Sequence, residues 1–252
     1  VKIIIRKGNF LNMLRIEKCY DSSIYTSKAF DLYFGGLSIG VLDIETTGLS
    51  PERSRLILGG LSIYDKAARK MRLLQLFAEN KDEEAALLKE YLTEISGLDI
   101  LITYNGKHFD INFIQRRMEL MGLSLDTLTG QACLPYNLDL YLVINGYSPL
   151  RKFLPNLKQK SVEDFMGLWS LREDEISGAE SVELYNRYLR CSAGSDERLQ
   201  QEALRCRDKI LLHNSDDVLQ LGKLIKVIEK SDFHRAMHRM GFPCGDLTVS
   251  SI

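Results

Sequence analysis

The spacing of hydrophobic and polar residues predicts a chain that alternates strands with helices and then becomes helical. Short apolar runs predict strands, whereas apolar residues at three- and four-residue steps predict amphipathic helices. The run at residues 39–44 is a buried strand that ends in acidic residues. The other predicted strands are 55–64, 71–77, 99–104 and 138–144, and the predicted helices are 82–95, 109–121 and several segments between 161 and 230.

This order of elements predicts an α/β fold, in which helices flank a mixed β-sheet and the C-terminal half is helical. Residues 1–37 show apolar patches without a clear period, so we expect a peripheral N-terminal extension there, which can add a strand or a helix. One domain is expected over residues 38–230. Residues 231–252 are expected to form a C-terminal tail.

The composition and the net charge argue against several classes of protein. The chain has 252 residues, of which 45% are hydrophobic and 27% charged, and its apolar runs are too short to cross a bilayer. Five scattered cysteines without a Cys-x-x-Cys pair argue against a structural zinc site, and with no visible secretory signal they favour the cytoplasm. The net charge of −1 argues against tight non-specific nucleic-acid binding, but not against an enzyme that holds a strand end briefly.

The first candidate motif places two carboxylates at the end of the first predicted strand. Asp43 and Glu45 lie two residues apart, so both point to the same face of that strand. Like charges at this spacing repel each other unless a cation lies between them, and oxygen ligands favour magnesium or manganese. A solvated strand end is the plainer interpretation of these two residues alone.

The second candidate motif, Tyr104-Asn105-Gly106-Lys107-His108-Phe109-Asp110, follows a predicted strand and begins a helix. Asn-Gly supplies the turn, and Asp110 falls in the first helical turn, where the helix dipole favours an anion. A simple helix cap is the alternative. Open α/β sheets usually bind ligands at the carboxyl ends of their strands, which favours a functional role.

The third candidate motif lies on a long helix that contains His213, Asp216 and Asp217. His213 and Asp217 interrupt an apolar stripe formed by Ile210, Leu221, Leu224 and Ile228. Asp216 instead groups with Lys209, Gln220 and Lys223, on a side that we expect to be solvated. A carboxylate on a buried stripe needs a compensating partner such as a metal, so Asp217 is the better candidate. A structural His–Asp pair remains the alternative.

Together these motifs resemble the DnaQ-like (DEDD) superfamily of 3′–5′ exonucleases, which are RNase H-like proteins. Within it, the closest resemblance is to the YprB-like RNase H-like domain family. This resemblance extends over about residues 38–230 and includes the second motif, Leu154-Pro155-Asn156-Leu157-Lys158 and Ser161-Val162-Glu163.

The resemblance implies a two-metal nuclease that uses two Mg²⁺ or Mn²⁺ ions to hydrolyse phosphodiester bonds at the 3′ ends of single-stranded DNA or RNA. It implies that Asp43, Glu45, Asp110 and Asp217 hold the ions and that His213 activates the attacking water. The implied substrate-binding residues are Thr46, Thr47, Gly48, Leu49, Asn105 and Lys107.

The third motif departs from the superfamily pattern in one respect. That pattern has a Tyr with three residues between it and the Asp, or a His with four between. His213 stands at the Tyr-type spacing from Asp217. This crossed position, together with the near-neutral charge, leaves a rival hypothesis open, namely a catalytically weak module that binds nucleic acid or a protein partner.

Overall fold

The computed structural model of the protein describes residues 2–7, 13–21, 24–65, 68, 70–168 and 176–242. Its centre is one seven-stranded sheet in the order β1-β2-β5-β4-β3-β6-β7. Adjacent strands from β1 to β3 run antiparallel, whereas β6 and β7 run parallel to β3, so the predicted mixed sheet is confirmed. The strands are β1 (Lys2–Lys7), β2 (Leu14–Tyr20), β3 (Ile39–Thr46), β4 (Leu56–Asp65), β5 (Lys70–Phe77), β6 (Ile100–Thr103) and β7 (Tyr136–Asp139).

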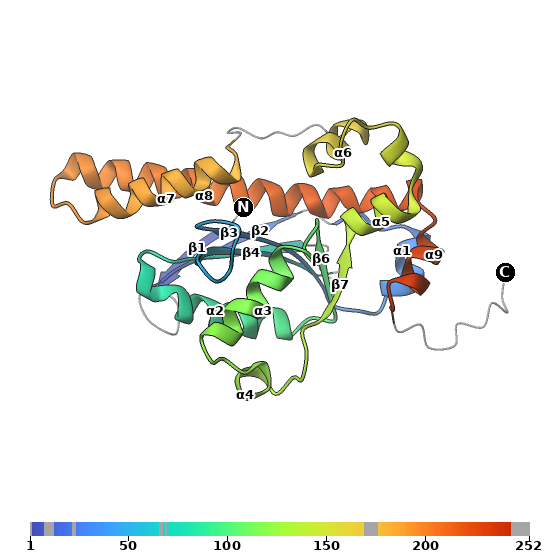
Figure 1. The fold of residues 1–252 in the computed structure, drawn as a ribbon, viewed down its shortest axis with the longest axis horizontal. Coiled ribbons are helices and arrows are strands. Elements are labelled where there is room, and N and C mark those ends of the chain that lie inside the picture. The colour runs from blue at the N-terminus through green and yellow to red at the C-terminus, as the bar shows by residue number, and fades with distance from the viewer. Residues whose placement is uncertain are drawn as a thin grey trace.

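Helices cover both faces of this sheet. The long helix α8 crosses one face, while α2 and α3 lie against the other (Figure 1). The α-helices are α1 (Lys28–Phe34), α2 (Glu84–Ser96), α3 (Asp110–Leu120), α4 (Leu125–Thr129), α5 (Leu140–Tyr147), α6 (Gln159–Phe165), α7 (Gly178–Ser192), α8 (Glu197–Leu224) and α9 (Phe233–Arg239). Three short 3-10 helices, η1 (Lys81–Glu83), η2 (Pro149–Lys152) and η3 (Ile225–Lys230), adjoin them. Within the described residues, none of the helices combines the length and hydropathy that a membrane crossing requires.

Strand β3 shows how the sequence pattern positions the site. Its even-numbered residues Leu42 and Ile44 pack into the core on the α2 face, whereas Val41 packs into the core on the α8 face. Because side chains alternate along a strand, Asp43 and Glu45 continue the Val41 side. The two carboxylates therefore face helix α8 from the interior of the sheet.

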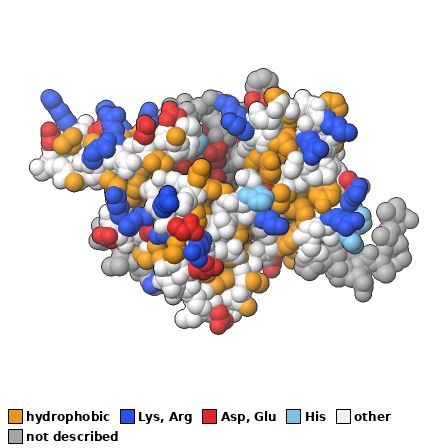
Figure 2. Space-filling view, viewed as in Figure 1, with side chains coloured by type: hydrophobic (Ala, Val, Ile, Leu, Met, Phe, Trp, Pro, Cys, Tyr) orange, Lys and Arg blue, Asp and Glu red, His pale blue; other side chains and the backbone are white. Residues whose placement is uncertain are grey.

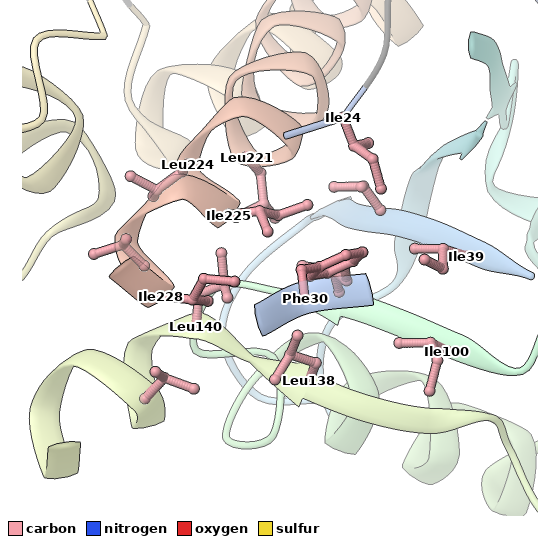
Figure 3. Packing of buried hydrophobic residues seen from close by; sticks show 14 of the residues in the cluster. Ile24, Phe30, Ile39, Ile100, Leu138, Leu140, Leu221, Leu224, Ile225 and Ile228 are labelled. Carbon is pink, nitrogen blue, oxygen red and sulfur yellow. The ribbon is translucent and has the colours of Figure 1, made fainter. Parts of the chain in front are cut away.

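The N-terminal segment adds two strands and a helix to the fold. Strand β2 pairs with β5 and carries β1 at the edge of the sheet. Helix α1 packs into the core on the α8 face, where Phe30 lies among Leu221 of α8, Ile39 of β3 and Leu138 of β7 (Figure 3). Residues before position 38 thus complete the layer that supports the candidate site.

Two further expectations differ from the structure. The strand predicted over residues 138–144 is wrong beyond Asp139, because β7 ends there and α5 begins at Leu140. Asp139 caps that helix by accepting a hydrogen bond from the Tyr141 amide at 3.0 Å. In the predicted tail, α9 buries Phe233 and Met237, while residues 243–252 lie outside the described part.

Candidate functional site

The first motif sits at the end of β3 under helix α8. Asn214 of α8 donates a hydrogen bond to Asp43 Oδ2 at 2.9 Å and another to the Asp43 carbonyl at 3.2 Å. Gln75 of β5 fixes Asn214 in turn, because its amide nitrogen donates to Asn214 Oδ1 at 3.1 Å. These bonds hold the Asp43 carboxylate in one orientation, and they link it to a residue 171 positions away in sequence.

The glycine pair in β4 explains how α8 comes this close. A Cβ on Gly60 would lie 2.1 Å from Asn214 Oδ1, and a Cβ on Gly59 would lie 2.8 Å from the Tyr91 ring on the opposite face. Gly60 pairs with Asp43 across the ladder. Only a residue without a side chain leaves room for the amide that positions Asp43.

The second motif brings Asp110 to the same strand end. The parallel β3–β6 ladder ends at the Val41–Ile102 pair, so the Ile44 amide is free to bond elsewhere. It donates to Asp110 Oδ1 at 3.2 Å. Asp110 begins α3 and is 5% exposed, so the turn between β6 and α3 delivers this carboxylate into the interior.

The third motif adds His213 and Asp217 of helix α8 to the site. His213 Nε2 lies 3.4 Å from Asp217 Oδ2 and 3.8 Å from Glu45 Oε1. One ligand-type atom from each of these three residues lies within 4.8 Å of the other two, which is a spacing that a single metal ion can bridge. The structure therefore brings residues of the first and third motifs within reach of one ion.

The electrostatics of the cluster are those of crowded carboxylates. Burial raises the pKa of Glu45 to about 8 and that of Asp110 to about 7. Burial also raises the pKa of Asp43 well above its ordinary range, and the charges of Asp217, Asp110 and Glu45 add to the rise. Each carboxylate thus makes ionisation of its neighbours harder, and a bound cation would reverse this effect.

The cluster opens into a hollow with a volume of about 650 Å³. Figure 2 shows acidic side chains gathered in a depression at the middle of the molecule, beneath α8. Thr46, Gly48 and Leu49 line the hollow, and the Leu49 side chain is 83% exposed. Thr47 does not line it, because Thr47 is bonded to Arg55 through both its backbone and its hydroxyl.

Asn105 and Lys107 do not line this hollow. Asn105 lines a neighbouring pocket, and Lys107 lines another one together with Asp139. Asp139, which sequence reasoning missed, accepts hydrogen bonds from the backbone amides of Asn105 at 2.8 Å and Lys107 at 3.0 Å. It thereby holds the turn before Asp110, where Asn105 adopts a left-handed φ of 62°. An Asp before an apolar helical run was the available signal, because it is a common helix cap.

The interpretation of Asp216 needs a correction. The side of α8 that carries Asp216 is solvated only in part, because Lys209 and Lys223 are exposed, whereas Asp216 is half-buried and Gln220 is 5% exposed. Asp216 acts on strand β2, where its charge opposes the burial-driven fall in the pKa of Lys18. Asp217 alone of the two lines the acidic hollow.

Comparison with known proteins decides the family. A family model described as the RNase H superfamily matches residues 41–229, a range that includes all three motifs. The chain belongs to the RNase H superfamily. This confirms the RNase H-like resemblance inferred from the motifs.

Three individual proteins show more distant similarity to this RNase H superfamily member. A "DNA polymerase III PolC-type" from Ureaplasma parvum is 34% identical over 116 residues, covering 35% of this chain. The chain spans only 8% of the length of that polymerase. A family B DNA polymerase from Pyrobaculum calidifontis shares the fold, with a TM-score of 0.52 and 15% identity over 88% of this chain and 30% of the polymerase. NrnC from Brucella melitensis, bound to pGG, matches 86% of this chain and 92% of its own at a TM-score of 0.35 and 15% identity.

Proposed function

We propose that this chain is a metal-dependent 3′–5′ exonuclease that removes nucleotides from single-stranded DNA or RNA ends. The observation that carries the proposal is the convergence of Asp43, Glu45 and Asp217 on one hollow, with the buried carboxylate of Asp110 close enough to raise the pKa of Asp43. Their mutual repulsion raises the free energy of the folded protein, so a structural role does not explain them. Membership of the RNase H superfamily and the partial match to a PolC-type DNA polymerase support a nucleic-acid substrate.

The donor set fits a magnesium or manganese site. Carboxylate oxygens are the ligands that these hard cations prefer, and four carboxylates provide enough of them for two ions. Asp43, Glu45, Asp110 and Asp217 would hold these ions. When bound, the ions supply a lowered pKa for the attacking water and positive charge for the phosphoryl oxygens.

The residues of the chain supply the rest of the chemistry. In the hydrolysis, a water oxygen bonds to phosphorus and the bond from phosphorus to the O3′ of the penultimate nucleotide breaks. The attacking water loses a proton, and the leaving O3′ takes one up from solvent. His213 would take the proton of the attacking water, since its Nε2 lies 3.8 Å from Glu45 Oε1 and 3.4 Å from Asp217 Oδ2. Asn214 keeps the Asp43 carboxylate turned toward the hollow.

The rim of the hollow suits the terminal nucleotide. Thr46, Gly48 and Leu49 form one wall, and Phe109 forms part of another. The exposed Leu49 side chain would pack against the terminal base. Thr47 would act indirectly, by holding the Thr46–Leu49 turn against Arg55.

Incubation with end-labelled single-stranded DNA and RNA tests the proposal. Wild-type protein with Mn²⁺ or Mg²⁺ should shorten a 5′-labelled strand stepwise, and chelator or Asp43→Asn should stop the reaction. A 3′-labelled strand should release single labelled nucleotides from the start. Intact strands under every metal condition would overturn the exonuclease proposal and favour a binding module.

A further inference from the structure

A second surface next to the acidic hollow has the chemistry of a nucleic-acid platform. It consists of residues 149–165, namely η2, the loop after it and α6, and we call it the η2–α6 surface. Phe153 is 70% exposed and Phe165 is 50% exposed. Solitary exposed apolar residues are common, but two phenylalanines within one short basic segment are less so. Figure 2 shows basic and hydrophobic side chains interspersed at the upper right of the view, where Figure 1 places α6.

The η2–α6 surface carries three exposed cations that can bind phosphates. Arg151, Lys152 and Lys158 are exposed, and within the described residues they form no ion pair. Two cations of the α7–α8 hairpin differ, because Arg187 pairs with Glu202 at 3.0 Å and Arg207 with Asp208 at 2.8 Å. The three cations of the η2–α6 surface are therefore better suited than these two arginines to bind phosphates.

A pocket lies between this surface and helix α8, which carries the third motif. It has a volume of about 550 Å³ and is lined by Tyr104, Asn105, Tyr141, Leu157, Lys158 and Gln159. The Gln159 amide donates to the Asp217 carbonyl at 3.4 Å, so the pocket directly adjoins the third motif. The rings of Tyr104 and Tyr141 meet edge to face at 6.0 Å. A pocket with aromatic rings, two amides and one lysine suits a base with its phosphate.

We propose that the η2–α6 surface binds the single strand next to the nucleotide being cleaved, with Arg151, Lys152 and Lys158 on phosphates and Phe153 stacked on a base. This inference rests on the proposed function, because it assumes that the acidic hollow holds the strand end. Asn105 would contact the nucleic-acid strand in the pocket beside the η2–α6 surface, and not in the acidic hollow.

Anisotropy with a labelled twelve-nucleotide oligothymidylate in Ca²⁺ measures strand binding without requiring cleavage. Arg151→Glu with Lys152→Glu should weaken binding at least tenfold. It should also flatten the salt dependence, by about 0.7 in log–log slope for each phosphate that the protein no longer neutralises. Phe153→Ala should weaken binding about fivefold or more, and Phe153→Tyr should restore it, because stacking needs only an aromatic face.

Arg190→Glu with Lys209→Glu is the matched control. These cations line the outer hollow of the α7–α8 hairpin, which shares Glu183 with the acidic hollow and also contains Glu180, and the change in net charge is the same. The control should bind nearly as well as wild type. Equal weakening in both double variants, or none in the first, would overturn the proposal. So would competition by polyglutamate as strong as that by unlabelled oligonucleotide, since the surface would then favour an acidic protein.

Hydrolysis of thymidine 5′-(p-nitrophenyl phosphate) separates this proposal from the proposed function. The small ester needs only the acidic hollow, so Arg151→Glu with Lys152→Glu should cleave it at the wild-type rate while its KM for the oligonucleotide rises. If the wild type cleaves neither substrate, the nuclease proposal fails, and the binding measurement still decides the platform. A fall in ester hydrolysis equal to the fall in strand cleavage would contradict the platform.

Discussion

Two clusters of carboxylates lie on opposite faces of the same sheet, and their charge balance differs. On the α2 face, Arg15 contacts Glu90 at 2.5 Å and Glu94 at 2.7 Å, and Arg72 contacts Glu94 at 3.0 Å. On the α8 face, the groups that act on Asp43 are three further carboxylates and the neutral amide of Asn214. Arginines of the chain neutralise the cluster on the α2 face, whereas the cluster on the α8 face would need cations from solution.

The pKa values express this difference. Burial alone would raise the pKa of Glu94, but hydrogen bonds from Arg15 and Arg72 outweigh burial and lower it. Burial raises the pKa of Glu45 to about 8, and the neighbouring carboxylates add to the rise. Burial is therefore compensated in one cluster and opposes the folded state in the other. A buried carboxylate therefore indicates function when its charged neighbours share its sign.

Removing one carboxylate from the acidic site should have the largest effect. Asp217→Asn should lower the rate of strand cleavage by about 10³-fold or more, the upper range for one group that stabilises a developing charge. Asp216→Asn is the matched control, since Asp216 acts on β2 and does not line the hollow. Equal reductions in a single-turnover cleavage assay would mean that the two aspartates are wrongly distinguished.

Removing an arginine from the cluster on the α2 face should lower stability and leave catalysis intact. Arg15→Leu leaves the buried Glu90 carboxylate without its partner, which should lower the free energy of unfolding by about 3 kcal/mol. Arg116→Leu removes exposed ion pairs with Glu52 and Glu119, and it should lower the free energy of unfolding much less, because solvent screens these pairs. Urea titration measures both changes. A catalytic defect in folded Arg15→Leu would show that the two clusters are coupled.

His213 tests whether the acidic site uses a base. His213→Ala should lower the cleavage rate about 10²-fold, the usual scale for removal of a general base. His213→Tyr should recover part of the rate with a flatter pH profile, because a tyrosine can position water without taking its proton. If His213→Ala keeps the wild-type rate and pH profile, the histidine is a structural neighbour or a metal ligand that the site can replace.

The smallest effect concerns pH and stability in the absence of metal. The folded-state pKa values of Glu45 and Asp110 lie above the unfolded values of about 4, so the folded protein holds extra protons between about pH 4 and pH 8. Stability from this site should fall as the pH rises through that range. Asp43→Asn in EDTA should therefore exceed the wild-type Tm by more at about pH 8 than at about pH 5. An equal difference at both pH values would argue against the raised pKa values.

The sequence predicted the parts of the site that depend on local periodicity. Alternation along β3 placed Asp43 and Glu45 on one face, and the helix stripe placed His213 beside Asp217. The strand predicted over 138–144 failed because a short apolar run fits a buried strand and a helix equally well. The hydrogen-bonded cap at Asp139 decides between them.

Other features depend on contacts between distant segments. The bond from Asn214 to Asp43 joins residues 171 positions apart, and it needs the missing side chain of Gly60. The side of α8 with Asp216 was expected to be solvated because the sequence does not show that β2 lies against it. Periodicity identifies the faces of an element, but only the fold shows which element covers each face.

Calorimetric titration with Mn²⁺ at about pH 7 tests most directly whether the acidic cluster is a cation site. Since the pKa of Glu45 is raised to about 8 and that of Asp110 to about 7, part of the cluster holds protons at this pH. Metal binding should displace them, so the measured enthalpy should change with the ionisation enthalpy of the buffer. Wild type should bind Mn²⁺ with proton release, and Asp43→Asn should bind it at least tenfold more weakly. Absence of Mn²⁺ binding, or equal binding by Asp43→Asn, would contradict the account.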